Sequence, residues 1–343
     1  MRKPMERASM KVIAEEVGLS MMTVSRVLSG NGAVAPATAQ KIHEVAERLK
    51  YRPNRLVRAV KTGRSGLIGV VMPTGLGSFY GSVLSGIHDY FAGQDTSILL
   101  SQVHGNQGER AIEDELKALH RLIEMRVDGI ILRPANDAAT PHYFEEILER
   151  GMPMVVIDRY LPSFPCDFVG TDDIGGGEEA ASRMLTRGLK KLLLITAGEM
   201  VGTSRDRAAG FRNHLKSRRA GVVLDTLACP SFEPNEDLIE KHLRISGTPF
   251  DGIFAISDSL GIGCFRALRK LNRRIPDDVA LFGFGAVGAS DGYNFPFSTF
   301  DQHPEIIGKS SAELLDKRIS NNGSKVLPKQ TVRLQATFID RGT

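Results

Sequence analysis

The stretch Ser20-Met-Met-Thr-Val-Ser-Arg-Val-Leu28 decides how the first part of this 343-residue chain folds. Its valines and leucine recur at helical spacing and form one apolar face. Residues 11–17 have a similar face, and Gly18 can supply a tight turn between the two helices. A serine precedes each helix, Ser9 and Ser20, and can cap its first turn. The pattern predicts a helix-turn-helix, whose second helix can enter the major groove of DNA.

Any two short helices joined by a glycine share this pattern, so the charge around them decides between a purely structural pair and a DNA-binding one. Residues 1–64 contain 13 Lys and Arg against 5 Asp and Glu, a net charge of +8. Because the whole chain carries +4, the remaining residues carry −4. Basic charge confined to the segment with the helix-turn-helix favours phosphate binding.

The composition narrows the remaining classes of protein. The chain contains no run of 18 apolar residues, and its first residues do not resemble a signal peptide. The three cysteines are far apart and match no metal-ligand spacing. We therefore expect a cytoplasmic protein with reduced thiols and with neither a metal nor a cofactor.

A third helix is expected from Pro36, which completes a helix-turn-helix domain over residues 1–50. Residues 51–65 form a hinge or linker without an apolar stripe. Basic residues recur in it at every third position, namely Arg52, Arg55, Arg58, Lys61 and Arg64. Such a segment is either a solvated linker or a helix that forms only when DNA neutralises its charge.

From residue 66 onward, apolar strand-like runs alternate with helical stretches, which predicts an α/β core of parallel sheets. These runs are residues 66–72, 97–100, 129–132, 154–157, 191–195, 252–256 and 279–284. Their number indicates two doubly wound lobes within residues 66–343. Ligands of such sheets bind beyond the carboxyl ends of the strands, so charged residues directly after the runs are candidate binding residues.

Together these features resemble the lactose/galactose repressor (LacI) family of bacterial transcription regulators. The motifs that carry the resemblance are Thr23-Val-Ser-Arg-Val-Leu28, Tyr51-Arg-Pro-Asn-Arg55, Val127-Asp-Gly-Ile-Ile131, Asp158-Arg159, and Ile275-Pro-Asp-Asp-Val-Ala280. The resemblance implies a homodimer on a pseudo-palindromic operator, with a hinge helix in the minor groove. It also implies a core like the periplasmic sugar-binding proteins, with a small effector between two lobes.

Such cores cross three times between their lobes, and we place the crossings near residues 164–167, 294–299 and 327–331. The first lobe would then comprise residues 66–165 and 297–328. The second would comprise residues 166–296 and 329–343.

The resemblance also assigns residues to the DNA interface. Met21 and Met22 match the family's base-reading pair, and methionine can pack on a thymine methyl group. Arg26 is suited to bind a guanine edge, whereas neighbouring polar residues would contact phosphates. Val60 matches the residue that enters the minor groove. The predicted DNA-binding set is Ser20, Met21, Met22, Thr23, Ser25, Arg26, Asn54, Arg55, Val60 and Lys61.

In the core, Phe79 and Tyr80 match an aromatic wall for a sugar ring, although they could simply pack a helix. Asp258 is expected to cap a helix that begins near Ser259. The predicted effector-binding set is Phe79, Tyr80, Arg133, Asp158, Arg159, Arg207, Ser257 and Gln302.

Two departures from the family pattern bear on the effector. Ser257 stands where the family has Asn, and Gly285 stands where it has a sugar-binding Asp. Three arginines would then face a single clear carboxylate, Asp158, which favours a sugar acid or sugar phosphate because Arg binds such anions through paired hydrogen bonds. Alternatively, Arg133 pairs with a surface acid and Gly285 makes room for a bulkier neutral ligand.

Two other classes of function share features with a ligand-controlled repressor. A solute-binding protein of a transport system would share the core but not the basic first 64 residues. An enzyme would need a nucleophile, a base or a phosphate loop, and we find no Gly-x-Gly-x-x-Gly after a strand and no Walker loop. Residues 175–177 (Gly-Gly-Gly) are expected to ease close packing of helices. We therefore expect a DNA-binding regulator that is not an enzyme.

Overall fold

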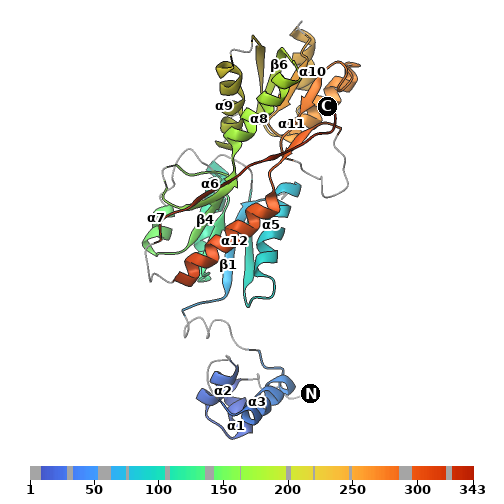
Figure 1. Ribbon diagram of the computed structural model, residues 1–343. Helices are drawn as coiled ribbons and strands as arrows, with labels where there is room; N and C mark the ends of the chain where they lie inside the picture. Colours follow the sequence, from blue (N-terminus) through green and yellow to red (C-terminus); the bar gives the residue numbers. More distant parts are fainter. Residues whose placement is uncertain are drawn as a thin grey trace. The chain divides into compact units, whose positions relative to one another are not determined.

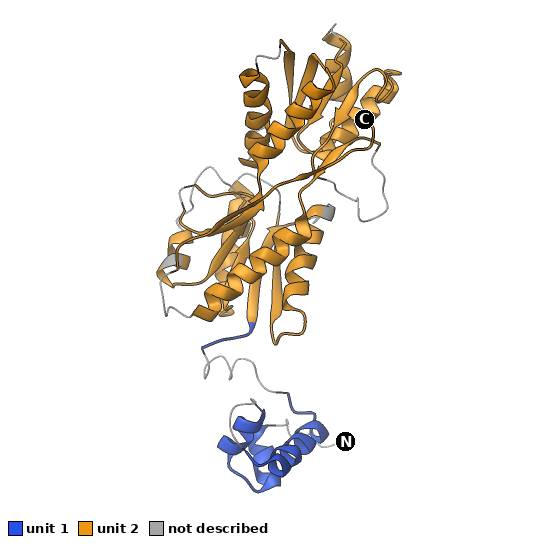
Figure 2. Ribbon diagram, in the orientation of Figure 1, with its two compact units in different colours: residues 1–66 blue, residues 67–343 orange. Residues whose placement is uncertain are grey.

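The structure is a computed structural model that describes residues 9–28, 34–52, 63–74, 77–104, 109–135, 143–162, 164–197, 202–218, 221–246, 249–285, 296–321 and 327–343. The chain divides into two compact units, residues 1–66 and 67–343 (Figure 2). Most of the hinge predicted at 51–65 lies outside the described residues, so its conformation stays a prediction. Within the described part, no helix is long and apolar enough to cross a membrane.

The first unit contains the predicted helix-turn-helix and a third helix: α1 (Met10–Val17), α2 (Met21–Leu28) and α3 (Pro36–Arg48). The Ser9 hydroxyl accepts a 3.3 Å hydrogen bond from the backbone N–H of Val12 and so caps α1. Gly18 ends α1 in the left-handed region with φ of +70°, where a residue without Cβ is favoured. The three helices bury a small apolar core of Ile13, Ala14, Val17, Val24, Val27, Ile42, Val45 and Ala46.

The first lobe of the second unit is built on a six-stranded parallel sheet in the order β11-β5-β4-β3-β1-β2. The strands are β1 (Leu67–Pro73), β2 (Ser97–Val103), β3 (Gly129–Leu132), β4 (Met154–Ile157), β5 (Asp167–Thr171) and β11 (Thr331–Leu334). Helices α5 (Gly77–Phe91) and α12 (Pro304–Asn321) lie side by side on one face (Figure 1). The apolar core on the other face includes residues of α6 (Glu109–Glu124) and α7 (Tyr143–Glu149).

The second lobe has a four-stranded parallel sheet in the order β7-β6-β8-β9. Its strands are β6 (Lys191–Ala197), β7 (Val223–Cys229), β8 (Gly252–Ala255) and β9 (Ala280–Phe282). Its helices are α8 (Asp173–Thr186), α9 (Gly202–Ser217), α10 (Glu236–Ile245) and α11 (Asp258–Lys270). An antiparallel ribbon of β10 (Thr299–Asp301) and β12 (Thr337–Ile339) packs on this lobe. The prediction of two doubly wound parallel sheets is confirmed.

The lobe boundaries predicted from the sequence are wrong by several residues. β5 pairs in parallel with β4, and β11 pairs with β5, so both strands belong to the first lobe. Asp167 at the start of β5 is held there by Arg318 of α12, which reaches its two carboxylate oxygens at 2.7 Å each. β10 instead packs on the second lobe, because Phe300 is buried in that core.

The three crossings therefore follow these strands rather than precede them. They lie at Asp172, at residues 302–303 and at residues 335–336. The corrected first lobe comprises residues 67–171 and 304–334. The corrected second lobe comprises residues 173–301 and 337–343.

One pair of helices in each lobe meets at glycines, backbone against backbone. A Cβ on Gly86 of α5 would overlap the carbonyl of Glu305, and one on Gly308 of α12 would overlap the carbonyl of Val83. Helices α8 and α9 meet in the same manner at Gly177 and Gly210. The prediction that the glycines at 175–177 ease close packing is confirmed for this pair of helices.

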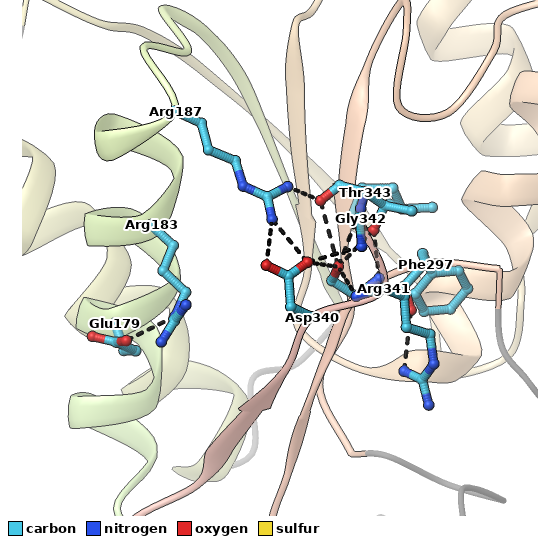
Figure 3. A network of polar contacts seen from close by, with 10 residues as sticks. Glu179, Arg183, Arg187, Phe297, Asp340, Arg341, Gly342 and Thr343 are labelled. Atoms are coloured by element: carbon cyan, nitrogen blue, oxygen red, sulfur yellow. Dashed lines mark hydrogen bonds and ion pairs between the residues drawn. The ribbon is translucent and has the colours of Figure 1, made fainter.

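The residues after β12 are tied to the second lobe by a polar network (Figure 3). Arg187 donates to both carboxylate oxygens of Asp340, at 3.0 and 3.1 Å. The backbone N–H of Arg341 donates to the Ser298 hydroxyl at 3.0 Å, and the Thr343 hydroxyl donates to a carbonyl of β9 at 3.1 Å. These contacts anchor the chain after the third crossing to the second lobe.

Candidate DNA-binding helix and effector site

Helix α2 presents a polar and thioether face to solvent. The side chains of Met21 and Met22 are 52% and 65% exposed, and Arg26 is exposed as well. Val24 and Val27 on the opposite face are buried in the domain core. This arrangement confirms the predicted orientation of the helix and leaves the predicted base-reading side chains accessible to a partner.

The start of α2 is organised by Ser20. Its hydroxyl accepts a 3.2 Å hydrogen bond from the backbone N–H of Thr23 and lies 3.0 Å from the Thr23 hydroxyl. Both hydroxyls stay at the exposed end of the helix, where a phosphate could replace their mutual contact. The other predicted DNA contacts Asn54, Arg55, Val60 and Lys61 lie outside the described residues, and Ser25 is half-buried on α2.

In the first lobe, three predicted effector residues meet at the carboxyl ends of the strands. Tyr80 lies near the start of α5, Arg133 follows β3 and Asp158 follows β4. The Tyr80 hydroxyl donates to Asp158 Oδ2 at 2.8 Å and accepts from Arg133 Nε at 3.0 Å. Burial raises the pKa of Tyr80 to about 12, so its hydroxyl stays protonated and remains a donor.

Two further predicted residues have partners inside the lobe. The centre of the Phe79 ring lies 5.1 Å from that of Tyr80 in an edge-on arrangement, and Phe79 packs against the apolar core. Arg159 is buried and donates at 2.7 Å to the carbonyl of Ala135, whose N–H donates to Glu115. The described contacts of Arg159 thus hold the loop after β3.

A second cluster surrounds Arg207 on α9. Its Nε donates to Asp173 Oδ1 at 2.7 Å, and its Nη1 donates to the carbonyl of Ile256 at 2.9 Å. Its Nη2 donates at 2.7 Å to the side-chain oxygen of Gln302, which also accepts from Thr171 at 3.1 Å. The structure therefore brings the predicted Arg207 and Gln302 together, at the first two crossings between the lobes.

Asp173 was absent from the sequence prediction, and its presence corrects the charge count on which an anionic effector was favoured. The sequence prediction sets only Asp158 against the arginines, whereas Asp173 is a further carboxylate that is buried and directly paired with Arg207. Arg133 has its own carboxylate partner, Asp158, at 3.6 Å. Arg133 and Arg207 are therefore each paired with a carboxylate, which reduces the surplus of arginine that pointed to a sugar acid or phosphate.

Burial raises the pKa of Asp173 to about 7, against the opposing effect of the Arg207 cation. The negative charge of Asp158 acts in the same direction as burial. The two clusters therefore lie within electrostatic range of each other.

The start of α11 differs from the prediction in one detail. Ser257, not Asp258, is the N-cap: its hydroxyl accepts from the N–H of Leu260 at 3.4 Å. Asp258 is the first residue of the helix and accepts a 2.5 Å hydrogen bond from the Thr299 hydroxyl. The backbone of Gly285 has φ of +139°, which an Asp would adopt only with strain, so the family's acid does not suit this backbone.

Described residues of the core also line hollows outside these clusters. One of about 330 Å³ lies at α10 and α11, next to Phe250 and Arg273. Another of about 450 Å³ lies between α8 and the third crossing. Among the described residues, no group of three or more His, Cys, Asp and Glu could hold a metal ion.

Two family models match the chain. Residues 9–54 match "Bacterial regulatory proteins, lacI family", and residues 181–343 match "Periplasmic binding protein-like domain". A similar curated protein is the HTH-type transcriptional regulator CelR of Thermobifida fusca, 27% identical over 92% of both chains.

Solved structures share the fold. The lac repressor dimer bound to operator and the anti-inducer ONPF has a TM-score of 0.84 and 20% identity, over 98% of both chains. A complex of the transcriptional regulator CelR with cellobiose has a TM-score of 0.68 and 24% identity, over 97% of this chain and 98% of that one.

The chain belongs to the LacI family of bacterial regulatory proteins. It is a DNA-binding transcriptional regulator with a helix-turn-helix unit and a periplasmic-binding-protein-like core.

Sequence reasoning missed Asp173 because it missed β5. Residues 167–171 (Asp-Phe-Val-Gly-Thr) have only two consecutive large apolar residues, too few to stand out as a buried strand. A signal was nevertheless present: a pair of acids, Asp172 and Asp173, stands directly before a glycine-rich helix start. One acid caps α8 and the other faces Arg207.

Proposed function

We propose that this LacI-family protein is a repressor that binds a pseudo-palindromic operator as a homodimer and changes its DNA affinity when a small effector binds. The observation that carries the DNA-binding role is the exposed face of α2, with Met21, Met22 and Arg26 accessible above a buried valine face. Arg26 would read a guanine edge, and the methionines would pack on thymine methyl groups. The remaining contacts, to phosphates and at the hinge, are proposed for Ser20, Thr23, Ser25, Asn54, Arg55, Val60 and Lys61.

We propose that the effector binds at the two clusters on the strand ends, with Tyr80, Arg133, Asp158, Arg207 and Gln302 as its contacts. Each arginine has a carboxylate partner, so the site offers both donors and acceptors in balance. A neutral, hydroxyl-rich molecule such as a sugar suits that balance, and CelR is an example of a related regulator in complex with cellobiose. Phe79 remains a proposed stacking contact. Arg159 and Ser257 are proposed as supports of the site, since their described partners are backbone groups.

Two finer points follow from the proposed role. A protein that regulates transcription acts where the DNA is, so we propose a cytoplasmic location. We also propose no enzymatic activity, which is supported by the names of the relatives as transcriptional regulators. The transport alternative is not retained, because the lacI-family match covers residues 9–54, in the basic part of the chain.

The test is selection of bound duplexes from a random pool, followed by titration of the selected duplex. We expect a pseudo-palindromic sequence, an apparent Kd that rises steeply with salt, and a change in Kd with one of a panel of neutral sugars. Arg26→Ala serves as the matched variant, because it removes a proposed base contact from the exposed face of α2. Binding without any sequence preference would contradict the proposed regulator, whereas sequence-specific binding that no sugar alters would contradict only the effector class.

A further inference from the structure

Asp173 and Arg207 form a buried ion pair at the start of the second lobe. Asp173 is the first residue of α8, and Arg207 lies on α9. Their side chains are only 4% and 7% exposed, and the Nε to Oδ1 distance is 2.7 Å. At such low exposure the charge of one partner decides how the other interacts with a third group, because little water screens them.

The remaining contacts of Arg207 with described residues are uncharged. They are the carbonyl of Ile256, the side-chain amide oxygen of Gln302, and the face of Phe284, whose ring centre lies 4.1 Å from the guanidinium carbon. The compensating negative charge of Arg207 therefore comes from Asp173. Without that carboxylate, the same guanidinium would attract an anionic group of a ligand.

We propose that Asp173 sets the charge selectivity of the effector site: its carboxylate compensates Arg207, so this end of the site accepts an uncharged hydroxyl group and excludes a carboxylate or a phosphate. The inference rests on the proposed function, since it concerns the effector of that same site. It goes further by assigning the selectivity to one residue that touches the arginine.

The pair is held in place by the helices that carry it. Gly177 lies one turn after Asp173 on α8 and contacts the backbone of α9 at the carbonyl of Arg207. Gly210 lies one turn after Arg207 and contacts the backbone of α8 at Ile174. Because both contacts are backbone to backbone, a change of charge at residue 173 need not move either helix.

Protonation of Asp173 has the same consequence as its replacement by a neutral residue. The charged groups that act on it are Arg207, which favours its ionised form, and Asp158 and Asp206, which disfavour it. Burial is the largest influence and raises its pKa to about 7. Exclusion of anions is therefore expected above neutral pH and is expected to weaken below it.

The experiment uses sulfate as the probe, because sulfate keeps its charge across the pH range and requires no knowledge of the natural effector. Sulfate binding to the full chain is measured by calorimetry at constant ionic strength, at pH 8.5 and pH 5.5. The isosteric Asp173→Asn keeps an oxygen that can accept from Arg207 Nε and removes the charge. The heat measured for the double variant Asp173→Asn/Arg207→Gln is subtracted from each measurement. This removes the contribution of sulfate bound at the basic N-terminal unit.

After this subtraction, the remaining signal reports sulfate bound at Arg207. At pH 8.5 we expect Asp173→Asn to bind this sulfate at least tenfold more tightly than the wild-type chain does. At pH 5.5 we expect the wild-type chain to approach the variant, whose own affinity should not change with pH. Asp172→Asn is the matched control: Asp172 caps α8 through the N–H of Gly175, an asparagine can do the same, and its sulfate affinity should equal that of wild type.

Equal sulfate affinity of wild type and Asp173→Asn at pH 8.5 would overturn the proposal. If the variant does not fold, the wild-type chain still decides, because sulfate affinity that is the same at both pH values contradicts compensation by Asp173. These outcomes are independent of operator binding, so a failure here leaves the proposed regulator to its own test.

Discussion

The hydroxyl of Tyr80 and the carboxylate of Asp158, 78 residues apart in the sequence, are joined by a hydrogen bond of 2.8 Å. The same hydroxyl accepts from Arg133, so one phenol connects the start of α5 with the ends of β3 and β4. Because Tyr80 is buried, its protonated form persists and the direction of the hydrogen bond is defined. The Tyr80 hydroxyl thus positions Asp158 and Arg133 relative to one another.

Tyr80→Phe is expected to lower the unfolding free energy by about 1–3 kcal/mol, because it removes a buried donor from Asp158 and a buried acceptor from Arg133. Urea unfolding measures the change. The matched control is Tyr90→Phe, whose hydroxyl donates to Asp316 at the longer distance of 3.1 Å, and whose effect should be smaller. If the two variants lose the same stability, the Tyr80 hydroxyl has no special role in the cluster.

Arg26→Ala is expected to weaken binding to the selected operator by about 1–3 kcal/mol and to flatten the preference at one base pair. Arg26→Lys keeps the charge but lacks the paired donors that read guanine, so it should lose the preference while largely retaining the salt dependence. Fluorescence anisotropy on operators with single base changes measures both. Unchanged relative affinities in Arg26→Ala would exclude direct readout by this residue.

Met22 is expected to pack on a thymine methyl group, and deoxyuridine tests this directly because it lacks only that methyl. Replacing thymine by deoxyuridine at each operator position in turn should weaken wild-type binding at one position or more. The loss at the position that Met22 contacts should disappear in Met22→Ala, and the loss at a position contacted by Met21 should not. A set of deoxyuridine effects identical in both proteins would argue against the contact.

Asp173 is expected to make stability depend on pH. Its pKa is raised from 3.8 to about 7 in the folded chain, so between these values the folded state keeps a proton that the unfolded state has lost. The unfolding free energy should therefore fall as pH rises from about 4 to 7, by at most about 1.4 kcal/mol per pH unit from this group. Asp173→Asn should remove this slope, and Asp172→Asn should keep it. Parallel pH profiles of wild type and Asp173→Asn in urea unfolding would contradict the assignment.

Two Gly→Ala changes in helices are expected to change the stability of the fold in opposite directions. Gly177→Ala places a methyl group against the Arg207 carbonyl and should destabilise by about 1–3 kcal/mol, because the two backbones must separate. Gly81→Ala on α5 meets no atom within 4 Å and should stabilise by up to about 1 kcal/mol through helix propensity. Thermal unfolding compares them. A neutral Gly177→Ala would show that α8 and α9 tolerate a looser contact.

The sequence predicted the helix-turn-helix and the two parallel sheets because both depend on local periodicity. The face of Val24 and Val27 and the long apolar run of β1 are visible without any knowledge of distant contacts. β5 and β11 were not recognised as strands, because each is short and has few consecutive large apolar residues. Their place in the first sheet depends on pairing with each other, across more than 160 residues.

The effector residues were predicted from strand ends and resemblance, and the structure brings most of them into two clusters. The sequence could not show which group each of these side chains contacts. Arg159 donates to a backbone carbonyl, Ser257 caps a helix, and Arg207 pairs with Asp173. Each of these depends on which side chain a tertiary contact places opposite. Counting charges along the chain therefore predicted a surplus of arginine that the pairing of Arg133 and Arg207 with carboxylates reduces.

The glycine contacts of α5 with α12, and of α8 with α9, have a mechanical consequence. Helices that touch through their backbones cannot slide without losing many contacts at once, so each lobe resists internal shear. Compliance is then concentrated in the three short crossings at residues 172, 302–303 and 335–336. Arg207 donates a hydrogen bond to Gln302, which lies on one of these crossings. A molecule that competes for Gln302 would therefore act on the crossing between the lobes and not on the interior of either lobe.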